Sequence, residues 1–167
     1  MNMISALRRN GRIQLAELSR RTNVPISTLH ERLKQEIAEG VVHPSALLNF
    51  GKLGFDTRAY ILIGVDPAEK DKLLSYLSKH QNVNSLFRIN SGWTALMECV
   101  FKDMYALENF IEGVEKQFTI RQKQVCYVLD ELRREAFLSD ADLLPGLMGG
   151  SFKYSKGKKG QIKRGVS

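Results

Sequence analysis

The chain has 167 residues, of which 43% are hydrophobic, enough for one mid-sized domain or two small ones. Its two cysteines exclude a disulfide framework, and no apolar run approaches the roughly 20 residues of a membrane-spanning helix, so we expect a cytoplasmic protein. The net charge of +7 is uneven: residues 1–50 carry +3, residues 51–142 carry −2, and residues 143–167 carry +6. This distribution is typical of a protein that meets a polyanion at its two ends.

Residues 1–45 are predicted to form three short helices, over 2–10, 14–22 and 25–39. The sequence TNVP separates the second helix from the third, because Asn tolerates a left-handed turn and Pro25 suits only the first turn of a helix. Gly40 is expected to end the third helix, and Val41–Val42 to begin a short wing strand. Two helices joined by such a turn are typical of a winged helix-turn-helix domain.

The third predicted helix has only a narrow apolar stripe, formed by Ile26, Leu29 and Leu33. If this helix enters the major groove of DNA, its N-terminal side chains meet base edges and its cations meet bases or phosphates. The candidate contacts on this helix are Ser27, Thr28, His30, Arg32 and Lys34. The candidate phosphate contacts around it are Arg8, Arg9, Arg12, Arg20 and Arg21. A solvated charged face is the competing interpretation for each of these cations.

Residues 46–56 are expected to be a linker, and residues 57–135 a ferredoxin-like domain in a chain of the α+β class. The expected strands are 57–65, 83–90, 93–101 and 120–132, and the expected helices are 66–80 and 103–118. The order βαββαβ predicts a four-stranded antiparallel sheet with both helices on one face. Asp66 and Asp103 are expected to cap the two helices, Glu69 to complete a capping box, and Gly92 to take a positive φ in a hairpin turn.

Both faces of the predicted sheet carry apolar side chains. Ala59, Ile61 and Ile63 share one face, while Tyr60, Leu62, Leu96 and Val100 share the other. Since both helices cover one face, we expect the other to pack against a second copy of the chain, which makes those last four residues the predicted dimer interface.

Residues 136–167 are expected to be a basic, largely disordered tail, because their composition offers little apolar surface to bury. Cys99 and Cys126 lie in apolar runs and are expected to be buried, reduced thiols. No metal-ligand spacing, nucleophile–base pair or phosphate loop is present in the sequence. We therefore expect no metal, no cofactor and no catalytic residues.

The sequence resembles the Lrp/AsnC family of prokaryotic transcription regulators over about residues 2–132. The segment from ISALRRNGRIQLAEL to EIAEGVV resembles the family's N-terminal helix-turn-helix, FGKLGF resembles its connector, and the βαββαβ unit resembles its oligomerisation and effector (RAM) domain. The parts of the sequence most specific to this family are Arg12 and the pattern ST–L–ER–K, which leads to Gly40. The resemblance implies a nucleoid-associated, sequence-specific regulator that binds double-stranded DNA as a dimer, tetramer or octamer, often with an amino-acid effector.

The sequence departs from the family pattern at two places. Pro25 stands where the third helix of the family usually begins with Ser. The hairpin loop that in the family reads Gly-x-x-Asp is Gly92-Trp93-Thr94-Ala95 here, so no acid is available to pair with an α-ammonium group. For the effector loop, formed by Ser91, Gly92, Trp93, Thr94 and Ala95, we expect either no amino-acid effector or a different ligand. The alternative is that Trp93 fills the pocket and serves only as a packing residue.

Two other functions stay open. An architectural protein that coats DNA with little sequence preference would use the same helix-turn-helix and the basic tail, which could equally bind RNA. A sirohaem decarboxylase, an enzyme built from related modules, would need a cluster of His and Arg residues in a tetrapyrrole pocket. Only His80 and Arg88, near the predicted strands, are candidates for such a cluster.

Overall fold

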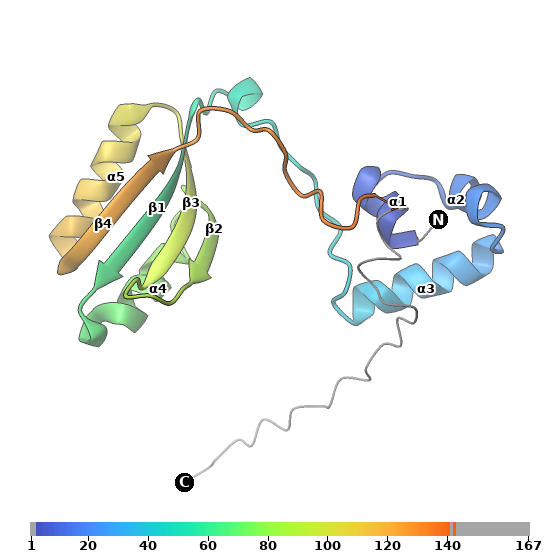
Figure 1. Cartoon of the computed structure of the whole chain (residues 1–167), viewed down its shortest axis with the longest axis horizontal. Helices are drawn as coiled ribbons and strands as arrows, with labels where there is room; N and C mark the ends of the chain where they lie inside the picture. The colour runs from blue at the N-terminus through green and yellow to red at the C-terminus, as the bar shows by residue number, and fades with distance from the viewer. Residues whose placement is uncertain (1–2, 141, 143–167) are drawn as a thin grey trace, which may run out of the picture. The chain divides into compact units, whose positions relative to one another are not determined.

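The computed structural model describes residues 3–140 and 142, and the chain divides into two compact units (Figure 1). The first unit combines residues 1–46 with the segment from residue 133 onward, and the second spans residues 47–132. None of the helices in the described ranges has the length and apolar character needed to cross a membrane.

The first unit contains the three predicted helices, α1 (Met3–Arg9), α2 (Leu15–Thr22) and α3 (Ile26–Ala38). Each is slightly shorter than its sequence pattern. The buried apolar residues of this unit form a small core of Met3, Ala6, Leu18 and Leu29. Because so few side chains are fully buried, the precise packing of each of them matters for the stability of the unit.

The ends of α3 follow the predicted turn chemistry, except for the wing strand. Asn23 takes a left-handed φ of 55° before the helix, and Gly40 takes a φ of 72° after it. The expectation of a strand at Val41–Val42 was wrong. Both of these amides donate to the Glu36 carbonyl, at 2.9 and 3.1 Å, and so close the helix C-terminus rather than pairing with a neighbouring strand.

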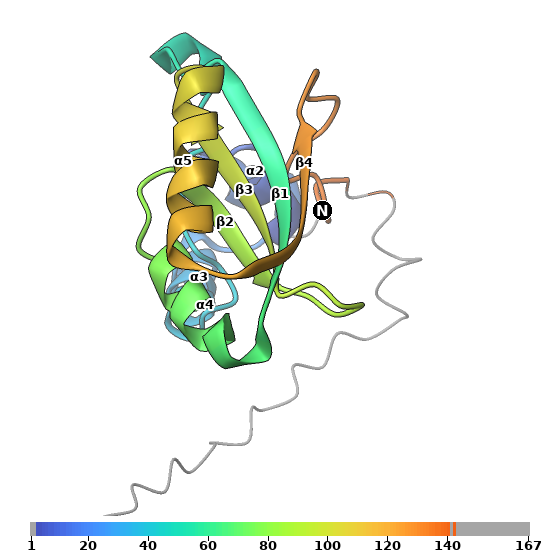
Figure 2. The same ribbon diagram turned by 90° about the vertical axis from the view of Figure 1, so that its left-hand side faces the viewer.

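The second unit is the predicted ferredoxin-like fold. Its elements are β1 (Thr57–Val65), α4 (Lys70–Leu77), β2 (Val83–Arg88), β3 (Ala95–Phe101), α5 (Met104–Gln117) and β4 (Ile120–Tyr127), with short 3₁₀ turns at Gly51–Leu53 and Pro67–Glu69. The strand order is β2-β3-β1-β4, and all neighbouring pairs are antiparallel. Figures 1 and 2 show α4 and α5 on the same face of this sheet.

The core of the second unit lies between that face and the two helices. Alternate residues of β1 and β3 point into it, and they meet Leu73 and Leu77 of α4 and Phe110 of α5. Burial of each such side chain stabilises the fold by roughly 1.5–3 kcal/mol. The helix-covered face of the sheet was therefore predicted correctly.

Two of the three predicted helix-start contacts are confirmed. The Asp66 carboxylate accepts from the Ala68 amide at 3.1 Å, and the Asp103 carboxylate accepts from the Ala106 amide at 2.8 Å. The capping box at Glu69 was wrong, because its carboxylate instead accepts from the Thr119 amide at 2.7 Å. Glu69 thus connects the start of α4 to the start of β4.

The C-terminal part differs from its expectation in three ways. β4 ends at Tyr127 rather than at 132. Cys126 is exposed, because it lies on the sheet face that the helices leave open. Residues 135–140, which we call the C-terminal strap, contact α1 through main-chain carbonyls. Amino-acid composition alone could not predict these contacts. Most of the predicted disordered tail, residues 143–167, lies outside the described residues.

Candidate nucleic-acid interface

The start of α3 is held by the turn that precedes it. The Ser19 hydroxyl of α2 donates to the Val24 carbonyl at 2.6 Å. Pro25, in an extended conformation (φ −56°, ψ 142°), then directs the chain into the helix, and its carbonyl accepts from the Leu29 amide at 3.1 Å. These contacts fix which side of α3 faces the core.

The side of α3 that faces away from the core is polar. Leu29 is 2% exposed and Leu33 is half-buried, but Ile26, expected to complete the buried stripe, is 49% exposed. The stripe is narrower than predicted because Ile26 is the first residue of the helix and the core beneath it is small. All five predicted contact residues of the helix are exposed: Ser27, Thr28, His30, Arg32 and Lys34.

Most of these side chains are free to bind a ligand. Among these five residues, only His30 forms an ion pair within the described part of the chain, with its Nδ1 at 3.6 Å from a Glu31 oxygen. Burial raises the pKa of Glu36, on the core side of α3, and the charge of Arg32 partly opposes this rise. Arg32 itself makes no ion pair with a described residue, so its guanidinium can reach a ligand without first breaking one.

The five predicted phosphate-binding arginines fall into two groups. Arg12 and Arg20 are exposed and without an ion-pair partner among the described residues. Arg21 pairs with Glu17 on the same helix, while Arg8 and Arg9 hold the C-terminal strap. Sequence alone does not separate these groups, because the partners of Arg8 and Arg9 lie more than 120 residues away in the chain.

A pocket of about 550 Å³ lies beside the hairpin that joins β2 to β3. Gly92, Trp93 and Thr94 of the predicted effector loop line it, whereas Ser91 does not, and the Ala95 side chain is buried in the core. The predicted turn is confirmed, with a φ of 59° at Ser91 and 85° at Gly92. Three of the five predicted loop residues therefore meet at one site.

The polar lining of this pocket comes from residues that sequence analysis missed. Lys70, Asn90, Arg121 and Gln122 contribute side chains from the start of α4, the hairpin and β4. Gln122 donates to the Gly92 carbonyl at 2.8 Å, and Arg121 pairs with Asp66 at 2.5 Å. The antiparallel pairing of β1 with β4 brings these distant segments together, so only the correct register could have revealed them.

The open face of the sheet carries the four residues predicted to form a dimer interface. Tyr60, Leu62 and Leu96 are half-buried and Val100 is already buried within its own unit. Leu96 lies beside Leu62 on β1 and beside Phe87 on β2, and Phe87 is 52% exposed. An apolar surface therefore covers the middle of this face.

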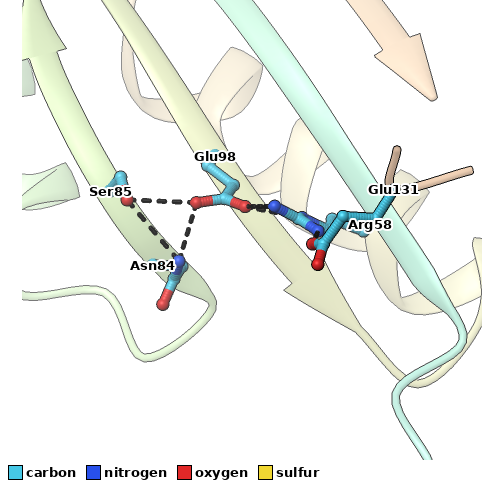
Figure 3. Close-up of polar contacts among 5 residues, drawn as sticks. All are labelled: Arg58, Asn84, Ser85, Glu98 and Glu131. Carbon is cyan, nitrogen blue, oxygen red and sulfur yellow. Dashed lines mark hydrogen bonds and ion pairs between the residues drawn. The ribbon is translucent and has the colours of Figure 1, made fainter. Parts of the chain in front are cut away.

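A buried ion pair interrupts that surface (Figure 3). Arg58 Nε donates to Glu98 at 2.5 Å, and its guanidinium also binds Glu131. Asn84 and Ser85 donate to the other Glu98 oxygen at 2.7 and 3.1 Å. Burial raises the pKa of Glu98, but these hydrogen bonds and the charge of Arg58 outweigh it, so the pKa lies below its ordinary value. The sequence prediction overlooked Glu98 because it lies between Leu96 and Val100 in an otherwise apolar strand.

The two candidates for an enzymatic tetrapyrrole site are used in structural contacts. The His80 ring packs edge-on against Phe110, with centroids 4.7 Å apart, and burial lowers its pKa. Arg88 lies on the surface near Asp71, at 3.5 Å. No group of three or more His, Cys, Asp or Glu residues in the described ranges is arranged to hold a metal ion.

Comparison with known proteins supports the nucleic-acid interface. The sequence profile of the winged helix-turn-helix DNA-binding family matches residues 1–42. An uncharacterized HTH-type transcriptional regulator of Pyrococcus horikoshii is 33% identical over 110 residues, which cover 65% of this chain and 70% of the relative. The Lrp-type regulator FL11 of Pyrococcus furiosus is 30% identical over 125 residues, covering 71% of this chain and 83% of the relative. The chain belongs to the Lrp/AsnC family.

The Lrp/AsnC fold accounts for both units of the chain. The crystal structure of the transcriptional regulator NMB0573 of Neisseria meningitidis, a complex with L-Met, superimposes with a TM-score of 0.70 at 24% identity. The superposition covers 80% of this chain and 93% of that one. Like its Lrp/AsnC relatives, which are named as transcriptional regulators, the chain is a DNA-binding transcription regulator.

Proposed function

We propose that α3 reads base pairs in the major groove of double-stranded DNA and that the protein regulates transcription at specific sequences. The observation that carries this proposal is the exposed face of α3, on which the side chains of Ser27, Thr28 and Arg32 have no hydrogen bond or ion pair with a described residue. Short hydroxyl side chains let a helix approach the bases closely, and an arginine can bind a guanine edge through two hydrogen bonds. Lys34 and His30 extend the same face toward the phosphate backbone of the DNA.

Arg12 and Arg20 are the phosphate contacts that we propose beside α3. Their guanidinium groups are exposed and unpaired among the described residues, so binding of a phosphate breaks no existing ion pair. A phosphate would have to displace Glu17 from Arg21, and Arg8 and Arg9 are already occupied. The phosphate-binding set is thus smaller than the five arginines of the sequence prediction.

We propose that two copies pack through the open faces of their sheets. Leu62, Leu96 and Phe87 form the centre of that interface, with Tyr60 at its side, and Val100 contributes little because it is already buried. A two-fold dimer presents two α3 helices to half-sites about one DNA turn apart, roughly 34–36 Å. We also propose that these dimers assemble further into tetramers or octamers of the chain. The same proposal places the protein at the nucleoid and gives it no enzymatic activity.

Selection of bound duplexes from a random pool tests this function. We expect enrichment of a sequence with two-fold symmetry and half-sites about 10 base pairs apart, because each half-site meets one α3 helix. The selected duplex is expected to bind at least about 1,000-fold more tightly than random DNA of equal length. Equal affinity for both would support the architectural alternative, in which the protein coats DNA without reading it.

The hairpin pocket is the proposed site of a small ligand, and we propose a carboxylate without an ammonium group. Lys70 and Arg121 line the pocket, and none of its described lining residues is acidic. Arg121 is held by Asp66, which lies outside the lining. Lys70 is therefore the cation that a carboxylate can bind there without breaking an ion pair, whereas an ammonium group finds no acidic residue in the lining. The volume of about 550 Å³ lies within the range of small-molecule sites.

A matched pair of compounds distinguishes the two ligand classes by calorimetry. We expect the 2-oxo acid with the methionine side chain to bind more tightly than L-methionine, by about tenfold. In a Lys70→Gln variant the affinity for the 2-oxo acid is expected to fall by a similar factor, because a charge-assisted hydrogen bond is lost. Tighter binding of L-methionine would show that the ammonium group has a partner and would overturn this ligand class.

A further inference from the structure

The hairpin between β2 and β3, which lines the pocket, is attached to β1 at its base. Figure 2 shows this hairpin projecting beyond the ends of the two strands. At its base, the Thr94 amide donates to the Ile63 carbonyl at 2.8 Å, and the Thr94 hydroxyl accepts from the Val65 amide at 3.2 Å. Residues 89–93 lie beyond this point and need another attachment to keep a fixed position.

That attachment comes from the side chain of Gln122 on β4. Its amide donates to the Gly92 carbonyl at 2.8 Å. In the described part of the chain, this is the one hydrogen bond that ties residues 89–93 to a strand other than β2 and β3. The N–H of the same peptide group, that of Trp93, donates to the Asn90 carbonyl at 3.3 Å. The peptide group between Gly92 and Trp93 is therefore held from both sides.

A β-bulge in β4 explains how Gln122 comes to face the hairpin. Gly64 of β1 pairs with Gln122, and the register shifts at the next residue of β1, which pairs with Ile120. Arg121 is therefore the extra residue of the bulge. Neighbouring side chains of a regular strand point to opposite faces, yet Arg121 and Gln122 both line the pocket. The bulge allows both residues to contribute to one site.

The absence of a side chain at Gly64 makes room for Gln122. Gly64 is buried, and a Cβ atom there would lie 2.8 Å from Gln122 Cγ, which is too close for two carbon atoms. It would also lie 3.1 Å from the Gln122 nitrogen and 3.3 Å from the Gly92 oxygen, the two atoms of the hydrogen bond. Glycine at this position thus lets the Gln122 side chain cross β1 and reach the hairpin.

We propose that Gln122 is the positioning residue of the hairpin pocket. Its side chain holds residues 89–93 in place, so that Asn90 and Trp93 form one wall of the ligand site. A wall that is already in position lowers the cost of binding, because fewer residues have to be ordered when the ligand arrives. The role in binding rests on the proposed small-ligand function of the pocket, whereas the attachment of the hairpin does not.

Amide hydrogen exchange of Trp93, measured by NMR in the ligand-free full-length protein, tests the attachment. Gln122→Met keeps an uncharged side chain of similar length but removes the donor. We expect exchange to become about two- to tenfold faster, the factor that corresponds to the loss of one hydrogen bond. Gln117→Met is the matched control, because Gln117 also donates to a carbonyl, that of Gly113 at 3.2 Å, but does not line the pocket. It should leave the exchange of Trp93 unchanged.

Gly64→Ala breaks the same hydrogen bond without changing Gln122 itself. The added methyl group is expected to displace the flexible Gln122 side chain, and circular dichroism melting checks that the variant is folded. Exchange of Trp93 should again become about two- to tenfold faster. In Gly64→Ala/Gln122→Met both changes remove one and the same contact, so the double variant should exchange no faster than either single variant. Native exchange in Gln122→Met, or independent effects that multiply in the double variant, would overturn the proposal.

Calorimetry with the 2-oxo acid that carries the methionine side chain measures the consequence for binding. Both single variants should bind it about two- to tenfold more weakly, because only molecules with the hairpin in place are competent to bind. Unchanged affinity together with faster exchange would overturn the role of Gln122 in binding. If the native protein binds no 2-oxo acid, the proposed ligand is wrong, and the exchange of Trp93 still decides whether Gln122 holds the hairpin.

Discussion

Replacement of Leu96 by aspartate is expected to convert the protein to a monomer and to weaken its binding to the selected duplex by at least about 100-fold. Leu96 lies at the centre of the open sheet face, between Leu62 and Phe87. In the proposed dimer, a carboxylate there is buried in the apolar centre of the interface, where an unpaired charge is costly. Loss of the dimer removes one of two linked DNA contacts, and such linkage raises overall affinity by 10²–10⁴.

Sedimentation velocity at micromolar concentration and anisotropy with the selected duplex measure the two parts of this prediction. Tyr105→Asp is the matched control, because Tyr105 is 84% exposed on α5, on the side of the sheet that the helices cover. It introduces the same charge in place of an apolar side chain and should leave both measurements unchanged. A Leu96→Asp protein that sediments as the native one does would contradict the proposed interface.

The second large effect is expected from Arg58→Met, which should destabilise the second unit by about 3–5 kcal/mol. The substitution keeps much of the apolar length of the side chain but leaves Glu98 buried without a counter-charge, and an unpaired buried charge carries a penalty of this size. Urea denaturation at a fixed protein concentration measures the loss. Arg88→Met, which removes an exposed arginine near Asp71, should change the free energy of unfolding by less than about 1 kcal/mol.

The double variant Arg58→Met/Glu98→Leu separates the ion pair from the strand that carries it. Since replacement of a buried pair by apolar residues is often neutral or stabilising, most of the lost stability should return. If Arg58→Met and the double variant were equally destabilised, the cause would be packing around Arg58 rather than the uncompensated charge of Glu98.

The same network predicts how stability depends on pH. The pKa of Glu98 lies below its ordinary value of 4.5, so the native state favours the ionised form more than the unfolded chain does. Its contribution is therefore complete above about pH 4.5 and is lost as the pH falls through the native pKa. In the Arg58→Met/Glu98→Leu variant this part of the acid dependence should disappear.

Features set by short-range chemistry were predictable from the sequence. Asn23, Gly40 and Gly92 take the left-handed φ values that their turns require, and Asp103 caps α5 as expected. The alternation of apolar residues along β1 and β3 also gave the helix-covered face of the sheet correctly. In each case the deciding contacts lie within a few residues, or follow from a period of two along a strand.

Features that depend on distant partners were not predictable. Glu98 becomes a buried anion only because Arg58, 40 residues away, lies on the neighbouring strand. Glu69 was assigned to its own helix, yet its partner Thr119 lies 50 residues further on. The same limit explains why Lys70 and Arg121 were missed at the hairpin pocket, and why Arg8 was assigned to DNA rather than to the strap.

The most direct measurement of the central claim compares single base-pair changes in the selected duplex for the native protein and for Arg32→Ala. If Arg32 binds a base edge, its removal should cost about 1–3 kcal/mol with the selected duplex and should abolish discrimination at one base pair per half-site. Lys34→Ala should weaken binding to every duplex alike. If Arg32→Ala lowers the affinity for selected and random duplexes by the same factor, α3 does not read sequence through this side chain.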